Sequence, residues 1–110
     1  MFVTIVNFPP VKTGKHSEFF EWFMKTNKDF EQQYGFIRRK LLKPMNGSTY
    51  AALIEHESYE TFMAMHKSDI YARAVEEGKP LFNGHPMPWF FEEINPRGCD
   101  AARYHLHVCI

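Results

Sequence analysis

The chain has 110 residues, enough for one domain with a single hydrophobic core. Its 13 Lys and Arg side chains balance its 13 Asp and Glu side chains, and they form no basic stripe, so we expect no nucleic-acid partner. No run approaches the roughly 18 apolar residues of a membrane span, and we expect no signal peptide before the first predicted strand. The two cysteines, both near the C-terminal end, form no disulfide framework, and we expect a cytoplasmic protein.

The first two predicted elements are a strand and a helix. Residues 2–8 (FVTIVNF) are mostly β-branched and aromatic, which is typical of a strand buried on both faces. Over residues 15–33 the apolar side chains recur at three- and four-residue spacing, which predicts a helix. We expect Thr13 to be its N-cap and Gly35 to mark the turn into the next strand.

A hairpin and a second helical region follow. Residues 36–43 and 48–56 read as two strands joined by a turn at an Asn-Gly pair. Ser58 and Ser68 are predicted to cap a second helix and its continuation, which ends at Gly78. After a loop rich in Pro and Gly comes a final strand, WFFEEI, at positions 89 to 94.

This β-α-β-β-α-β order predicts a ferredoxin-like α+β fold, an antiparallel sheet with both helices on one face. Because the strands are apolar on both faces, the second face also needs a cover. A second copy of the chain is the simplest cover and would give a homodimer closed into an α+β barrel. We assign residues 1–94 to this domain and residues 95–110 to a C-terminal extension whose end alternates like a strand.

Four runs of the chain carry a family resemblance: VKTGKHSEFFEWF, YGFIRRKLL, YAALIEHESYETFMAMHKSDIYARA and PLFNGHPMPWFFEEI. Their specific marks are Gly14, the Gly35-Phe36 pair, and Phe62, His66 and Ser68 in the second helix. On these residues the chain resembles the antibiotic biosynthesis monooxygenase (ABM) family of dimeric α+β barrels. Members of this family include cofactor-free quinol and polyketide monooxygenases, haem-degrading enzymes and small-molecule isomerases, so the resemblance implies a fold more than an activity.

Asn7 is the first catalytic candidate. It shares one strand face with Val3 and Ile5, and a carboxamide on such an apolar face needs a hydrogen-bond partner or a ligand. A bond to a neighbouring loop is one interpretation. The resemblance implies the other, because several family enzymes carry an Asn in the first strand that points into the cavity.

His66 is the second catalytic candidate, on the same helix face as Phe62. Burial against the sheet would lower the pKa of the imidazole and keep it a base near neutral pH. A histidine on an apolar helix face is also a common structural residue. The resemblance favours catalysis, because in some family members a histidine here has a catalytic role.

Aromatic side chains could line a flat apolar pocket suited to a planar aromatic substrate. The candidates for substrate contact are Phe19, Trp22, Phe23, Phe62, Tyr71, Phe82 and Trp89. Plain core packing is the alternative, since an aromatic stripe at helical spacing usually belongs to a core.

Arg38 and Arg39 are adjacent in a predicted strand and therefore point to opposite faces. One of them faces a buried surface, where it can clamp an anionic oxygen or a carboxylate. We assign Arg38 as the substrate contact. A salt bridge to the partner subunit is the alternative.

The tail carries a weak metal motif. His105, His107 and Cys109 share one face of a predicted strand, and His-x-His can chelate zinc or copper. No further cluster completes the ligand set, so we predict no metal, and an added edge strand is the alternative. Cys99 and Cys109 are expected to stay reduced.

Three functions stay open. The first is a homodimeric monooxygenase that needs no cofactor and oxygenates a small electron-rich aromatic, with His66 as base and Asn7 holding an oxygen. The second is haem binding and degradation, from which the chain departs: Met65 replaces the family's Trp and Val75 its ligand His, unless His66 takes that role. The third is a non-enzymatic barrel that holds a small ligand or only a partner subunit.

Overall fold

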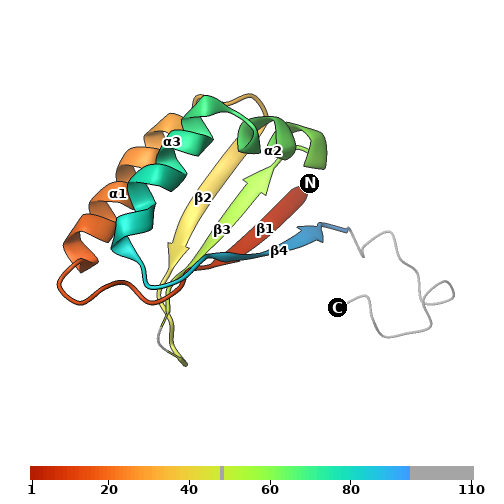
Figure 1. Cartoon of the computed structure of the whole chain (residues 1–110). Coiled ribbons are helices and arrows are strands. Elements are labelled where there is room, and N and C mark those ends of the chain that lie inside the picture. The colour runs from red at the N-terminus through yellow and green to blue at the C-terminus, as the bar shows by residue number, and fades with distance from the viewer. Residues whose placement is uncertain (48, 95–110) are drawn as a thin grey trace, which may run out of the picture.

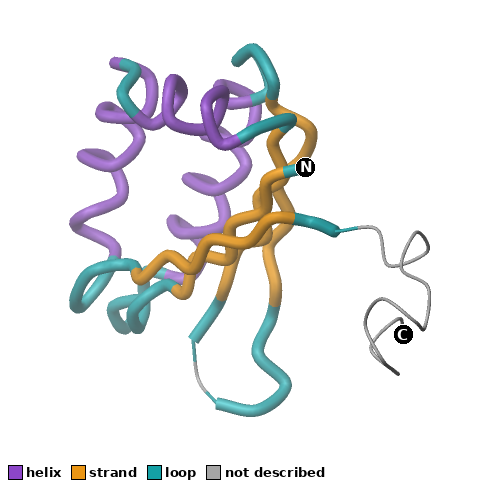
Figure 2. Tube along the Cα trace, turned by 90° about the vertical axis from the view of Figure 1, so that its right-hand side faces the viewer, coloured by secondary structure: helices purple, strands orange, loops and turns teal. Residues whose placement is uncertain are grey.

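The computed structural model describes residues 1–47 and 49–94 as a four-stranded antiparallel sheet covered on one side by helices (Figures 1 and 2). The elements are β1 (Phe2–Asn7), α1 (His16–Phe30), β2 (Phe36–Leu42), β3 (Ala51–His56), α2 (Tyr59–His66), α3 (Asp69–Gly78), the short 3-10 helix η1 (Lys79–Leu81) and β4 (Met87–Glu92). The strand order is β2-β3-β1-β4. This confirms the predicted ferredoxin-like α+β fold.

In the part of the chain that the structure describes, no helix has the length and apolar character to cross a membrane.

The helix starts show which capping predictions hold. Ser58 accepts a hydrogen bond from the Thr61 N–H (3.1 Å) and begins α2, and Ser68 accepts one from the Tyr71 N–H (3.2 Å) and begins α3. The prediction for Thr13 is wrong. The N-cap of α1 is Lys15, which makes no capping bond through its side chain.

Within a single copy of the chain the helices bury one face of β1. The prediction that a second copy covers the other face stays a prediction. Phe2 and Thr4 face the helices and are buried. On the other face Val3 and Ile5 are half-buried and Asn7 is exposed. The helices therefore cover one side of the sheet, and side-chain alternation decides which residues they bury.

The uncovered face of the sheet is largely apolar where β1 and β4 form it. Val3, Ile5 and Asn7 of β1 pair with Phe91, Trp89 and Met87 of β4, so these residues share that face. The three β4 side chains are 50%, 56% and 59% exposed, in the same order. We call this surface, made by Val3, Ile5, Met87, Trp89 and Phe91, the outer apolar face. Isolated exposed apolar residues are ordinary, but a contiguous patch of large ones indicates an interaction surface.

Gly35 holds the turn from α1 to β2 against the start of α2. Its φ of +84° lies in the left-handed region, and a Cβ atom there would stand 2.4 Å from the Thr61 Cβ. Thr61 is held in place, because its hydroxyl donates to the Ser58 carbonyl (3.1 Å) and lies 3.0 Å from the His56 Nδ1. No side chain therefore fits at position 35 without moving α2.

We expect Gly35→Ala to destabilise the fold more than Gly14→Ala, the matched control. Gly14 also has a positive φ (+81°), but a Cβ atom on it would meet nothing within 4 Å, so only backbone strain of roughly 1–2 kcal/mol is expected there. Gly35→Ala adds an overpacking cost of about 1–3 kcal/mol. Urea unfolding of both variants measures the difference, and equal free energies of unfolding would contradict the close packing against Thr61.

Candidate functional site

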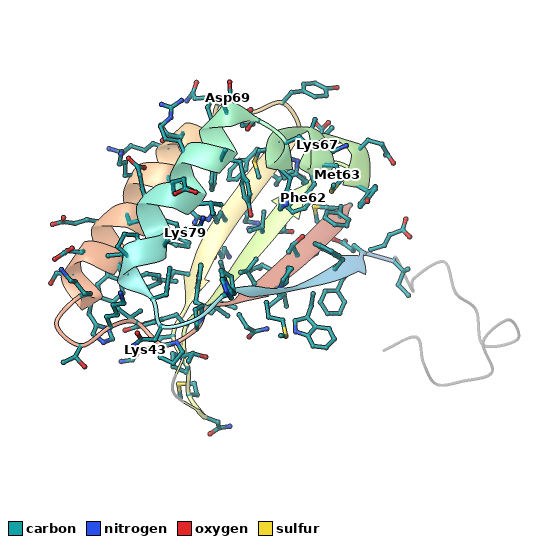
Figure 3. All side chains as sticks on the ribbon, in the orientation of Figure 1. Lys43, Phe62, Met63, Lys67, Asp69 and Lys79 are labelled. Carbon is teal, nitrogen blue, oxygen red and sulfur yellow. The ribbon has the colours of Figure 1, made fainter. Side chains whose placement is uncertain are left out.

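A cavity of about 310 Å³ lies between the helix-facing side of the sheet and the helices α2 and α3. This volume is at the lower end of the range for small-molecule sites. Most of the lining is apolar, and the side chains with polar groups are Thr4, Arg39, His66, Tyr71, Lys79 and His85. Figure 3 shows Phe62 directed from α2 toward the strands and Lys79 at the end of α3. The cavity is thus an apolar chamber with a small number of polar groups.

The aromatic predictions divide between the cavity and the core. Trp22, Phe62, Tyr71 and Phe82 line the cavity. Phe19 and Phe23 do not; Phe19 is fully buried and Phe23 nearly so, both within the core cluster. The alternative of plain core packing therefore describes those two residues.

Small residues keep the cavity open on the α3 side. Ala74 and Gly78 line it, and a Cβ atom on Gly78 would stand 2.7 Å from the Trp22 ring. The Trp22 indole N–H donates to the Ala74 carbonyl (2.9 Å). This hydrogen bond and the close approach to Gly78 fix the orientation of the Trp22 ring in the cavity wall.

His66 lies at the solvent-facing edge of the cavity against Tyr71. The two ring centroids are 4.3 Å apart, and the Phe62 ring lies 5.6 Å from that of His66. His66 is exposed, yet partial desolvation by these neighbours lowers its pKa below the usual 6.5. Burial raises the pKa of Tyr71, and the positive charge of Arg39 opposes that rise. At neutral pH the pair is therefore a neutral imidazole, able to accept a proton, beside a neutral phenol.

Arg39, not Arg38, points into the cavity. Phe36 faces the helices, and counting by twos from it would place Arg38 on the same side. The register of β2 against β3 shifts between Phe36 and Arg38, which leaves Ile37 as an extra residue. Arg38 therefore pairs opposite Glu55 on the far face and forms a salt bridge with it, and Arg39 turns inward.

The Arg39 side chain is 8% exposed and is held by polar and aromatic contacts. Its Nη1 donates to the Phe23 carbonyl (3.1 Å) and to the Thr26 hydroxyl (3.0 Å). The guanidinium carbon stands 3.8 Å from the Phe23 ring centroid and 4.9 Å from that of Phe30, within cation–π distance. Desolvation lowers the Arg39 pKa to about 9, so the group is still a cation at neutral pH.

Thr4 is the second polar group on the sheet side. It is fully buried, and its hydroxyl has no hydrogen-bond partner among the described residues. Thr4 pairs with Ile54 of β3, and Ile54 pairs with Arg39 of β2, so the three residues form a row across the sheet. An unpaired buried hydroxyl is unfavourable, and a ligand in the cavity could supply its partner.

Three predicted site residues lie away from the cavity. Asn7, Arg38 and Trp89 are all exposed on the far side of the sheet, and none of them lines the cavity. The structure thus corrects the expected placement of Asn7, which does not share a cavity with His66. It likewise corrects Arg38 and Trp89 as cavity contacts.

Three polar cavity residues, Thr4, Lys79 and His85, were missed in the sequence. The inward position of Thr4 could be deduced from the sequence, because side chains alternate along the strand and Phe2, two residues earlier, is buried. His85 lies in a Pro- and Gly-rich loop and carries no periodic signal.

Within residues 1–47 and 49–94 no three His, Cys, Asp or Glu side chains come together as a metal site. The weak metal candidates, His105, His107 and Cys109, lie outside the described residues, as does the predicted extension 95–110.

Comparison with solved structures supports the fold. SnoaB, a cofactor-independent oxygenase from Streptomyces nogalater, is 21% identical with a TM-score of 0.72, covering 84% of this chain and 93% of its own. A proposed antibiotic biosynthesis monooxygenase from Nitrosomonas europaea is 17% identical with a TM-score of 0.74, covering 86% of this chain and 99% of its own. No protein-family model and no curated protein sequence matches the chain. The chain thus has the fold of antibiotic biosynthesis monooxygenase proteins, as the resemblance implied.

The pKa of His66 should be lower in the folded protein than in urea, because its neighbours desolvate the ring. NMR titration of the ring protons measures both values, with His66→Asn for assignment. Since the unfolded state then binds a proton more readily, the free energy of unfolding should fall as pH drops below 6.5. A folded-state pKa at or above 6.5 would show that the ring is fully hydrated.

Proposed function

We propose that this protein is a cofactor-independent monooxygenase that acts on a small electron-rich aromatic such as a quinol or an anthrone. One observation carries the proposal: an apolar cavity with a neutral histidine of lowered pKa at its edge. A base is what oxygenation without a cofactor requires, because ionisation makes the substrate electron-rich enough to react with dioxygen. The shared fold with SnoaB supports the same activity.

The reaction balances with dioxygen as the only co-substrate. His66 takes a proton from the bound aromatic, and the anion gives electrons to dioxygen and forms a carbon–oxygen bond. Loss of water from the resulting hydroperoxide leaves a carbonyl. For an anthrone the CH₂ group becomes C=O, one oxygen atom enters the product, and the other leaves as water with the proton that His66 returns. All four electrons come from the substrate.

The remaining cavity groups hold the substrate and exclude water. Trp22, Phe62 and Phe82 offer ring faces and edges to a planar molecule. The Thr4 hydroxyl can donate to a substrate oxygen, and this hydrogen bond strengthens as negative charge develops there. Tyr71 packs on His66 and limits its hydration, which keeps its pKa low.

Haem is the alternative occupant, and the cavity does not fit it. A volume of about 310 Å³ is small for a tetrapyrrole, and the Tyr71 ring, 4.3 Å from the His66 ring, occupies one side of the only histidine on α2. No step is therefore assigned to haem.

We further propose that the working form is a homodimer in the cytoplasm. The outer apolar face exposes Met87, Trp89 and Phe91 along a strand that the helices leave uncovered. A second copy would bury this face by a twofold contact and protect the β4 edge from other strands. The non-enzymatic barrel of the sequence analysis would share this assembly but turn over no substrate.

His66→Asn should lower the rate of oxygenation about 100- to 10,000-fold, the usual contribution of a general base. The test substrate is the anthrone dithranol, followed by oxygen consumption after subtraction of the enzyme-free rate. His16→Asn, an exposed histidine of α1, is the matched control and should keep the wild-type rate. The wild-type rate should also fall as pH drops through the lowered His66 pKa, because the protonated ring is not a base. An unchanged rate in His66→Asn would refute the assigned role.

Trp89→Glu should convert a dimer into a monomer, because it places a charge in the outer apolar face. Light scattering after size-exclusion chromatography measures the mass. Tyr34→Glu is the control: Tyr34 is 82% exposed and lies outside the sheet. A monomeric wild type, or a dimeric Trp89→Glu variant, would rule out this interface.

A further inference from the structure

Arg39 is a buried cation without a counter-ion. Within residues 1–47 and 49–94 no Asp or Glu forms a salt bridge with it, whereas its neighbour Arg38 pairs with Glu55. Tyr71 cannot serve, because burial raises the pKa of its phenol and leaves it neutral. Buried charges in proteins are normally paired, since an uncompensated one costs several kcal/mol. The cavity that Arg39 lines is the place from which an anion could approach.

The guanidinium has one edge in use and one edge free. Nη1 donates to the Phe23 carbonyl and the Thr26 hydroxyl, while Nε is buried and has no hydrogen-bond partner. In the described residues Nη2 donates to no protein group either. The free edge therefore carries two parallel N–H groups, the arrangement that binds both oxygens of a carboxylate.

We propose that Arg39 binds a carboxylate of the substrate through its Nε–Nη2 edge, so that the cavity selects aromatic acids over neutral aromatics. Turnover of the bound acid rests on the monooxygenase function proposed above, whereas binding of the acid at Arg39 does not. A phenolate offers one oxygen and uses the paired N–H edge less completely than a carboxylate does.

The sheet sets where the rest of such a substrate lies. Arg39 and Thr4 stand in one row with a single strand between them, so their backbones are roughly 10 Å apart. Phe90 continues the row beyond Thr4 on β4. An aromatic acid held at Arg39 thus extends along the row toward Thr4, which can hydrogen-bond a ring oxygen, and toward His66 at the edge of the cavity.

A structural role for Arg39 makes different predictions. If the cation–π contacts and the two Nη1 bonds were its purpose, Arg39→Met would destabilise the protein and leave ligand choice unchanged. If Arg39 instead serves to bind an anion, Arg39→Met removes an uncompensated charge and still packs an unbranched side chain against Phe23. Urea unfolding should then show the ligand-free Arg39→Met variant to be at least as stable as wild type.

The experiment is isothermal titration calorimetry with two probes of the same shape, 2-naphthoate and neutral 2-naphthamide. Wild type should bind the acid at least about tenfold more tightly than the amide, as expected for charge-assisted hydrogen bonds. Arg39→Met should lose that preference and keep its affinity for the amide. Arg39→Lys, which retains the charge but not the paired N–H edge, should keep only part of it. Arg73→Met, which removes an exposed charge from α3, should behave as wild type.

Equal affinity of wild type for the two probes, no binding of either, or an undiminished preference in Arg39→Met or Arg39→Lys would overturn the proposal. The wild-type comparison decides even if Arg39→Met does not fold. Turnover of dithranol, which has no carboxylate, and of rhein anthrone, an anthrone that carries one, separates the two proposals. Selective binding of 2-naphthoate with turnover of neither anthrone would refute the monooxygenase and keep the acid site, and turnover of dithranol without selectivity would do the reverse.

Discussion

The candidate site depends on one irregularity in the sheet, the extra residue Ile37 in β2. Helices cover only one side of the sheet, so each strand residue lies either in the cavity layer or on the outer face, and alternation assigns it. The bulge reverses that assignment for the two arginines. Arg38 pairs with Glu55 outside, and Arg39 brings a charge into the apolar interior. Without the extra residue, alternation from Phe36 would turn Arg38 inward and Arg39 outward.

The cavity persists because its walls combine large fixed rings with very small residues. Trp22 is held by its bond to the Ala74 carbonyl and by contact with Gly78. Ala52 and Ala74 leave space that larger side chains would fill. Close packing elsewhere in the core, around Phe19, means that this space is a feature of these positions and not of loose packing throughout.

The lining of the cavity includes a neutral basic side chain, His66, and a charged side chain, Arg39. Contact with Phe62 and Tyr71 lowers the pKa of His66, so the ring is neutral and able to accept a proton at neutral pH, whereas Arg39 stays charged because a guanidinium is the most basic side chain. Tyr71 contacts the ring of His66 and feels the charge of Arg39. An anionic ligand at Arg39 would offset its charge, and the base would remain at the edge where a proton can leave for solvent.

Local patterns in the sequence determined the element order, the Ser58 and Ser68 caps and the turn at Gly35, because these depend on near neighbours in the chain. The sequence also indicated that His66 and Phe62 share a helix face, since helical spacing sets this. Only the tertiary structure decided that Arg39 rather than Arg38 enters the cavity, that Thr4 lies in the same row one strand away from it, and that Asn7 faces away. A bulge shifts every later side chain of its strand to the other face, and which face is covered depends on helices distant in sequence.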